Sequence, residues 1–224
     1  MFIRHGERAD KHPERNIQFE ERYDAQLTPI GEQQAIETGQ FLKEYIKTGN
    51  FEEILIESSP FLRVIMTSAN IARQIGINHI PINYDYREYL ESSSYNHQNP
   101  IPRLLINKYS QEEISQKYLN GMTYKFVRDY QQNDIEQMFP EDNEIVLNRV
   151  LGIAQNLAAK YSQSDKRVLH IIVTHGHLVR SLALQHGGQE QRFLYCNKTA
   201  LEVQNGLIKK LLFDSDDSHV ITKY

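Results

Sequence analysis

The stretch Phe2-Ile3-Arg4-His5-Gly6-Glu7-Arg8 opens the chain and predicts a short strand that ends in a cationic turn. Two apolar residues lead into Arg-His-Gly, and a glycine directly after a strand favours a change of chain direction. Only residues 1–4 are available for the strand, so either this strand is short or the sequence begins partway into it. A histidine and two arginines at one strand end suit an anion such as phosphate.

The clearest strand signal lies late in the chain, in the apolar run Arg-Val-Leu-His-Ile-Ile-Val-Thr over residues 167–174. Runs of this kind are typical of strands buried on both faces of a parallel sheet. The run leads into His175-Gly176-His177, and a helix is expected from about residue 178 to residue 186. A second histidine is therefore predicted at the end of a second buried strand.

Three long helices are expected between these two strand ends. Thr28-Pro29 predicts a capped helix start, and the helix is expected to end at Gly49. Ser59-Pro60 repeats the signal and predicts a second helix with Arg63 in its first turn, where outward N–H groups also favour an anion. A third, amphipathic helix is expected over residues 142–161.

Shorter apolar clusters predict strands over residues 51–57 and 78–86, and Asn205-Gly206 predicts a hairpin turn within residues 201–213. Alternating strands and helices predict an α/β fold, a three-layer sandwich with a mostly parallel central sheet and helices on both faces. Ligands bind such sheets outside the carboxyl ends of the strands. We therefore expect the histidines that end the first and the late strand to meet at one edge.

The length predicts one domain over residues 1–224, since chains of up to about 250 residues are routinely a single unit. The formal net charge of −4 argues against nucleic acid as a partner. No apolar run approaches the roughly 20 residues of a membrane span, so no membrane partner is expected. Cys196 is the only cysteine, which excludes an internal disulfide and favours a small buried apolar role. We expect a cytoplasmic protein, and the sequence carries no signal for its oligomeric state.

Residues 92–141 form the least regular stretch, rich in serine, asparagine, glutamine and proline. Within it, Ser110 and Glu113 predict one capped short helix. A loop-rich insertion of this length is usually functional or mobile, so we interpret it as a lid that shapes substrate choice. The charged stretch 9–23 is expected to be a surface loop, and residues 214–224 are expected to be loosely held.

Four separated motifs, in order, resemble the histidine phosphatase superfamily, which has the phosphoglycerate mutase-like fold. They are Arg4-His5-Gly6-Glu7, residues 27–35 (Leu-Thr-Pro-Ile-Gly-Glu-Gln-Gln-Ala), Ser59-Pro60-Phe61-Leu62-Arg63 and Val173-Thr174-His175-Gly176. A weaker fifth match is Tyr86-Arg87-Glu88. The opening motif with Asp10 is similar to the branch of the suppressor-of-T-cell-signalling and ecdysteroid-phosphate phosphatases.

The residue types fit the chemistry that this resemblance implies, phosphomonoester hydrolysis without metal or cofactor. Arg4 and Arg63 can hold a phosphate with bidentate forks, and His5 can attack phosphorus and form a phosphohistidine. His175, helped by the Gly176 N–H, can stabilise the transferring charge.

The resemblance adds two residues to this set. It implies that Arg8 also contacts the phosphate and that Glu88 gives a proton to the leaving group and then activates water. The spacing of the sequence does not separate Glu88 from Glu91 or Glu7 as this acid.

Three alternatives stay open at this stage. The chain could be a phosphoglycerate mutase-type phosphotransferase, although the serine and the Trp-Asn pair of those enzymes are absent after the first motif. It could be a non-catalytic member that binds phosphorylated partners. His175 and His177 could form a metal pair, since residues two apart on a strand share a face. The expected substrate is a phosphorylated small molecule or a phosphoprotein.

Overall fold

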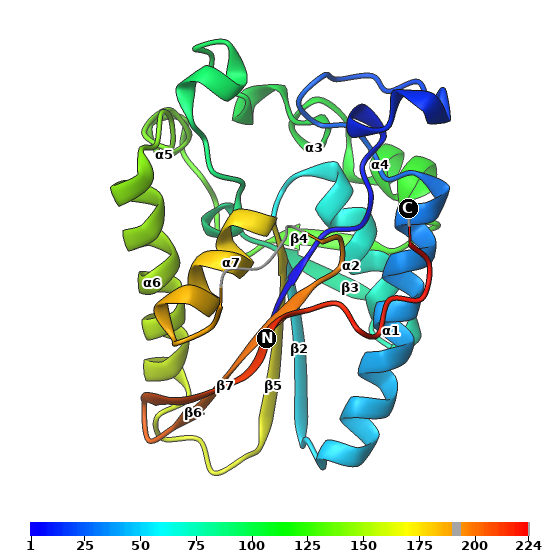
Figure 1. Cartoon of the computed structure of the whole chain (residues 1–224). Helices are drawn as coiled ribbons and strands as arrows, with labels where there is room; N and C mark the ends of the chain where they lie inside the picture. The colour runs from blue at the N-terminus through cyan, green and yellow to red at the C-terminus, as the bar shows by residue number, and fades with distance from the viewer. Residues whose placement is uncertain (190–193, 224) are drawn as a thin grey trace.

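A computed structural model of the chain describes residues 1–189 and 194–223 (Figure 1). Within these residues a central sheet has helices on both faces, which confirms the predicted three-layer α/β fold. The strands are β1 (Phe2–Arg4), β2 (Glu53–Ser58), β3 (His79–Ile82), β4 (Thr123–Phe126), β5 (Val168–Thr174), β6 (Lys198–Gln204) and β7 (Leu207–Asp216). The α-helices are α1 (Pro29–Gly49), α2 (Leu62–Gln74), α3 (Leu105–Lys108), α4 (Gln111–Tyr118), α5 (Gln132–Glu136), α6 (Asn143–Lys160) and α7 (Gly176–Gln185).

The strand order is β4-β3-β2-β5-β1-β6-β7. The first five strands in this order, from β4 to β1, run parallel to one another. β6 pairs antiparallel with β1, and β7 pairs antiparallel with β6 as the predicted hairpin. Although β1 is short, it lies between β5 and β6, and Arg4 pairs with Thr174. The residues that follow β1 and β5 therefore leave the sheet side by side, as predicted.

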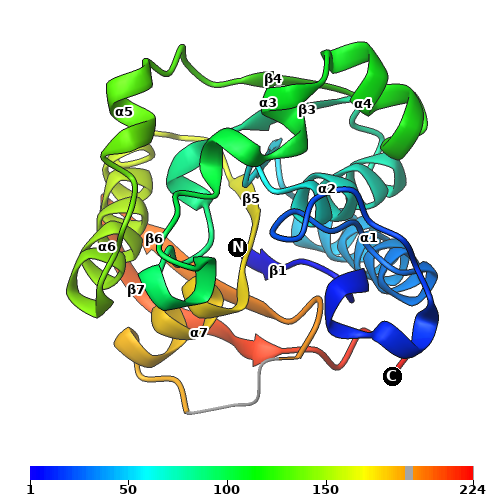
Figure 2. The ribbon, with the colours of Figure 1, turned by 90° about the horizontal axis from the view of Figure 1, so that it is seen from above.

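The long helices divide between the two faces of the sheet (Figures 1 and 2). α1 and α2 pack together on one face, and α6 and α7 pack on the other. Thr28 caps α1 as predicted, because its hydroxyl accepts from the Gly31 N–H at 3.0 Å. The part of the chain that the structure describes contains no helix long and apolar enough to cross a membrane.

Two predicted helix starts and one strand were wrong in detail. α2 begins at Leu62 after Phe61, rather than after Ser59, because the Asp24 carboxylate accepts the Leu62 N–H at 2.7 Å. α7 begins at Gly176, earlier than expected. The strand predicted over 78–86 ends at Ile82, and Tyr84–Tyr86 form a 3₁₀ turn instead.

The stretch 92–141 is more regular than the sequence predicts. It contains α3, α4, α5 and β4, and β4 extends the sheet as a parallel edge strand beside β3. The capping box at Ser110 is confirmed. Many of its apolar side chains lie in the main hydrophobic core, among them Ile101, Leu104, Ile114 and Leu119. This stretch is therefore built into the core, because buried apolar contacts outweigh its polar composition.

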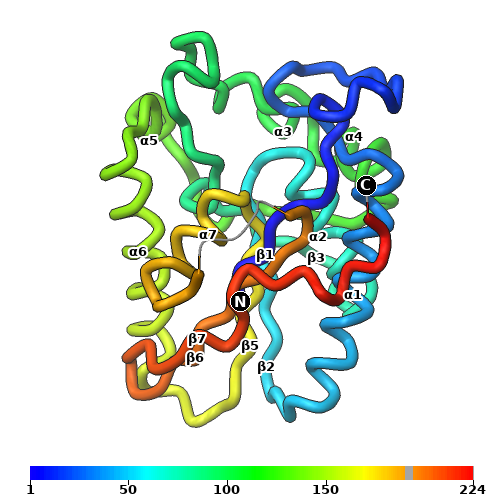
Figure 3. The backbone as a smooth tube through the Cα atoms, viewed as in Figure 1, coloured from blue at the N-terminus to red at the C-terminus, as the bar shows by residue number. Residues whose placement is uncertain are grey.

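The two remaining loop predictions also need correction. Residues 9–23 lie largely at the surface but contain two 3₁₀ turns, and Glu21 and Tyr23 are buried. The C-terminal segment is held rather than loose: it runs along α1 (Figure 3), where Glu37 accepts from the N–H groups of Ile221 and Thr222 at 2.8 and 3.0 Å. Residue 224 lies outside the described residues.

Candidate active site

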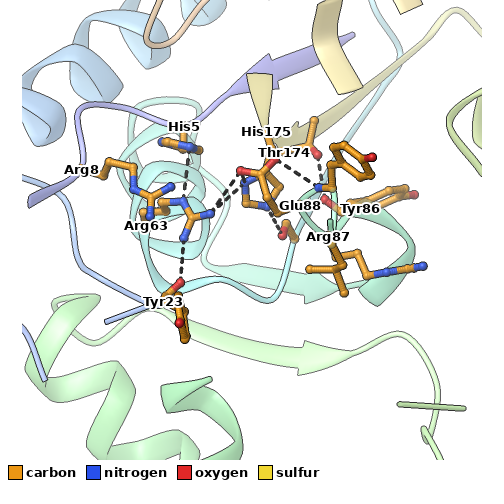
Figure 4. Close-up of polar contacts among 12 residues, drawn as sticks. His5, Arg8, Tyr23, Arg63, Tyr86, Arg87, Glu88, Thr174 and His175 are labelled. Carbon is orange, nitrogen blue, oxygen red and sulfur yellow. Dashed lines mark hydrogen bonds and ion pairs between the residues drawn. The ribbon is translucent and has the colours of Figure 1, made fainter. Parts of the chain in front are cut away.

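The two predicted histidines meet at the carboxyl edge of the sheet (Figure 4). His5 directly follows β1 and His175 directly follows β5, and their ring centroids lie 5.5 Å apart. Both side chains are buried, with His5 only 1% exposed. The parallel pairing of β1 with β5 produces this meeting.

The ring of His5 is oriented by its own turn. Its Nδ1 lies 2.7 Å from the Gly6 carbonyl oxygen, which can only accept, so Nδ1 carries the proton and Nε2 carries the lone pair. Nε2 faces the guanidinium of Arg63, whose Nε lies 3.3 Å away. Burial, and next the charges of Arg63 and Arg4, hold the pKa of His5 well below its usual value of 6.5. His5 is therefore a neutral imidazole with its lone pair in the site.

The turn at Gly6 depends on close backbone approach. A Cβ placed on Gly6 would lie 2.3 Å from the Gly31 carbonyl oxygen, and one on Gly31 would lie 2.2 Å from the Glu7 carbonyl oxygen. Only glycine at both positions lets the turn pack against the start of α1. Gly31 therefore has a packing role at the start of α1.

Arg63 lies at the centre of the site. Its side chain is fully buried, and it joins both histidines to Glu88. One terminal nitrogen donates to Glu88 Oε2 at 3.3 Å and lies equally far from His175 Nδ1, and the other donates to the Tyr23 carbonyl oxygen at 3.4 Å. The guanidinium also lies over the Phe61 ring, 4.6 Å from its centroid. Burial lowers its pKa, with help from the charge of Arg8.

His175 is held from both sides. Its Nε2 lies 2.8 Å from the Ser59 hydroxyl, and its Nδ1 lies 3.0 Å from Glu88 Oε2. Burial lowers the pKa of His175 to about 4 even though Glu88 acts in the opposite direction. The neutral ring satisfies both partners when Ser59 donates to Nε2 and Nδ1–H donates to Glu88, the tautomer we assign from this network.

Glu88 is the carboxylate that reaches the histidines. Burial alone would raise its pKa, but His175 and Arg63 together hold the pKa of Glu88 well below 4.5. Its side chain is 20% exposed, so solvent reaches it. Glu91 is exposed and accepts from Ser94, whereas Glu7 is buried against Thr28 and Arg15. The structure thus brings Glu88, and neither alternative, to the site.

Arg4 and Arg8 flank His5. The Arg4 guanidinium lies over the Tyr195 ring, 4.4 Å from its centroid, and that ring lies 6.0 Å from the His5 ring. Arg8 donates to both carboxylate oxygens of Asp10, at 2.5 and 2.7 Å. Burial would lower the pKa of Arg8, but the Asp10 carboxylate raises it. Both arginines lower the pKa of His5, so both act electrostatically on the site.

Gly176 lies beside His175 at the start of α7, whereas His177 packs against another residue. Gly176 is buried at the first position of α7, so the start of this helix points toward His175. The metal pair proposed for His175 and His177 assumed a continuous strand, and that assumption is wrong because β5 ends at Thr174. The His177 ring packs instead on Tyr89, with centroids 4.9 Å apart.

A different set could in principle hold a metal ion. One ligand atom each from His5, Glu88 and His175 lie within 4.8 Å of one another. The Arg63 guanidinium contacts all three of them at 3.3 Å. A cation bound there would lie against a permanent positive charge, so the set fits an anion better than a metal.

Sequence reasoning missed two residues that organise the site. Ser59 was assigned as a helix cap, whereas its hydroxyl contacts His175. Asp24 is fully buried and accepts the first N–H groups of two helices, Leu62 of α2 and Leu105 of α3, at 2.7 and 2.8 Å. Burial raises the pKa of Asp24 to about 6. No local pattern could indicate contacts over such separations.

The fold and the paired histidines define a phosphoglycerate mutase-like α/β protein. Residues 1–91 match the family model of the histidine phosphatase superfamily (branch 1), which confirms the predicted resemblance over this part of the chain. No curated protein matches the sequence.

Solved structures with the same fold include phosphatases and a mutase. A phosphoglycerate mutase from Bacillus anthracis str. Sterne is 16% identical with a TM-score of 0.62, over 99% of this chain and 94% of that one. The ecdysone phosphate phosphatase of Bombix mori is 18% identical with a TM-score of 0.56, over 90% and 87%. A phosphoserine phosphatase from Entamoeba histolytica is 20% identical with a TM-score of 0.52, over 98% of each chain. At these identities the likeness establishes the fold.

Proposed function

We propose that the chain is a metal-independent phosphomonoester hydrolase that forms a phosphohistidine on His5. The observation that carries the proposal is the orientation of His5: Nδ1 is bonded to the Gly6 carbonyl, and Nε2 faces the buried guanidinium of Arg63. A neutral nitrogen lone pair beside a fixed positive fork is what in-line attack on a phosphate dianion requires.

In the first step, His5 Nε2 attacks phosphorus as the bond between phosphorus and the leaving oxygen breaks. Arg63, Arg4 and Arg8 surround the transferring group with positive charge, while His175 Nδ1–H and the Gly176 N–H donate to its oxygens. Glu88 gives its proton to the leaving oxygen, which departs as an alcohol or phenol. In the second step, the Glu88 carboxylate takes a proton from water as that water attacks phosphorus and the bond between phosphorus and His5 Nε2 breaks. Phosphate and neutral His5 result.

Glu88 must be protonated for the first step, whereas the ligand-free site holds its pKa low. A bound phosphate dianion places negative charge beside this carboxylate and competes for Arg63, the residue whose charge helps keep it ionised. Both effects raise the pKa of Glu88. Substrate binding therefore prepares the acid.

The test is phosphate release from p-nitrophenyl phosphate, with and without EDTA. We expect EDTA-insensitive turnover and an acid-labile, base-stable label on the protein after quenching with radiolabelled substrate. His5→Ala should abolish the label and lower the rate by more than about 10⁴-fold. His79→Ala, which removes an exposed imidazole on β3, is the matched control and should leave both unchanged.

Other outcomes would contradict the proposal in separate ways. A label that survives in His5→Ala would reject this nucleophile, and EDTA-sensitive turnover would indicate a metal site. Phosphate binding without turnover would favour the non-catalytic alternative. Transfer of the label to an added phosphoglycerate in preference to water would favour the mutase alternative.

We also infer that residues 92–141 shape the choice of substrate. Tyr95 from this stretch packs edge-on against Tyr23, with ring centroids 5.2 Å apart, and the carbonyl of Tyr23 holds Arg63. The named substrates of the two phosphatases above are phosphorylated small molecules, which supports that class here. Tyr95→Leu should change the preference among aryl phosphates, alkyl phosphates and a phosphotyrosine peptide more than it changes turnover of p-nitrophenyl phosphate. Unchanged preference would reject this role.

A further inference from the structure

The segment that carries Glu88 lacks regular structure of its own. Residues 87–90 follow the 3₁₀ turn Tyr84–Tyr86 and belong to no helix or strand. Upstream, the Thr174 hydroxyl donates to the Tyr86 carbonyl at 2.7 Å and ties the segment to β5. The position of Glu88 beyond that anchor must come from side chains elsewhere in the molecule.

Arg149 of α6 supplies most of this support. One terminal nitrogen donates to the carbonyl oxygens of Asp85 and Arg87, at 2.7 and 3.2 Å. The other donates to the carbonyl oxygen of Glu88 itself at 3.3 Å. A single guanidinium thus reaches three of four consecutive carbonyls, including that of the acid. Lysine could not reproduce such a fork.

Glu141 holds the same segment from its other end. Its carboxylate accepts from Arg149 at 2.7 and 2.9 Å, from Arg87 at 2.7 Å and from the Leu90 N–H at 3.0 Å. The backbone N–H of Glu141 also donates to the Leu90 carbonyl oxygen at 2.9 Å. The Glu141 side chain is 1% exposed and the Arg149 side chain 10%, so solvent screens these contacts little.

We propose that Arg149 and Glu141 are positioning residues that fix the backbone of residues 85–90 and thereby hold the Glu88 carboxylate against His175 and Arg63. This proposal rests on the proposed function, in which Glu88 is the acid. Neither residue lies in a motif of the superfamily resemblance, and neither touches His5, His175 or Arg63 in any contact among the described residues. Their effect on the reaction would therefore pass through Glu88.

The test is a double-mutant cycle with Arg149→Lys and Glu88→Gln, assayed on glycerol phosphate and on p-nitrophenyl phosphate. A displaced acid should lower kcat/KM for glycerol phosphate by roughly 10- to 100-fold, because small errors in position are costly. The loss on p-nitrophenyl phosphate should be less than about threefold, since its leaving group hardly needs a proton. In the Glu88→Gln background, Arg149→Lys should cost nothing further.

The matched control is Arg73→Lys at the far end of α2, where arginine also donates to a backbone carbonyl, that of Leu119 at 2.8 Å. This control should leave both substrates unaffected. Equal losses on both substrates, or a full additional loss in the Glu88→Gln background, would overturn the proposal and leave a structural role. If Arg149→Lys does not fold, Glu141→Gln provides the same cycle, since it weakens the same support without changing side-chain shape.

A readout independent of activity separates this proposal from the proposed function. In the wild-type protein the Nδ1 of His175 lies 3.0 Å from Glu88. The ¹H and ¹⁵N resonances of that ring should shift in Arg149→Lys as the carboxylate moves away, and they should stay unchanged in Arg73→Lys. If the wild-type protein is inactive and Arg149→Lys still shows this shift, the proposed hydrolase function is rejected and the positioning role is retained. If the wild-type protein is active and Arg149→Lys shows no shift, the positioning role is rejected and the hydrolase function is retained.

Discussion

The side of the site with His5, the proposed nucleophile, and the side with Glu88, the proposed acid, are held in different ways. His5 and His175 extend directly from two paired parallel strands, and both are buried. Glu88 lies in an irregular segment, keeps 20% of its side chain exposed and depends on the side chains of Arg149 in α6 and of Glu141, which lies two residues before that helix. Strand pairing fixes a side chain through many backbone hydrogen bonds, whereas the acid depends on a few contacts from distant residues. We therefore expect the positions of His5 and His175 to be more rigid than the position of Glu88.

The largest effect after loss of His5 should come from Arg63, which joins the two sides. Arg63→Lys keeps a positive charge but cannot contact both histidines, Glu88 and the Tyr23 carbonyl together. We expect kcat/KM to fall on the order of 10³-fold on aryl and alkyl phosphates alike, as for other phosphoryl-transfer arginines. Steady-state kinetics on both substrates measures this. A loss under tenfold would mean that Arg63 is peripheral.

A smaller and more selective effect is expected on the acid side. Glu88→Gln removes the proposed proton donor while its amide can still accept from Arg63, so the site should stay intact. We expect a loss on the order of 10²-fold for glycerol phosphate and less than about tenfold for p-nitrophenyl phosphate. Glu91→Gln is the matched control, because Glu91 is three residues away and exposed. Equal losses on the two substrates would show that Glu88 does not protonate the leaving group.

The same contrast explains what could be predicted from the sequence. His5 and His175 directly follow strands, so apolar runs predicted that they meet, and a helix signal predicted Arg63 in a first turn that favours an anion. The choice of Glu88 over Glu91 came from a family resemblance, since spacing alone does not separate them. Ser59, Asp24, Glu141 and Arg149 could not be predicted, because each acts through partners far away in the sequence. The core packing of 92–141 was missed for a related reason: its apolar residues follow no continuous period.

The smallest expected effect is on stability, and it tests whether water is excluded from the His175 ring. Burial lowers the pKa of His175 to about 4 from 6.5, so as pH falls below 6.5 the unfolded chain takes up a proton before the folded protein does. This contribution is complete above pH 6.5 and decreases as pH falls toward 4. At pH 5 the lost part is about 2 kcal/mol, from about 1.4 kcal/mol for each of the 1.5 pH units below 6.5. Urea unfolding measures the free energy of unfolding at pH 7 and at pH 5. The decrease between these two pH values should be smaller in His175→Gln than in the wild-type protein by about that amount. His79→Gln should behave like the wild-type protein, and an unchanged fall in His175→Gln would mean that the His175 ring is solvated.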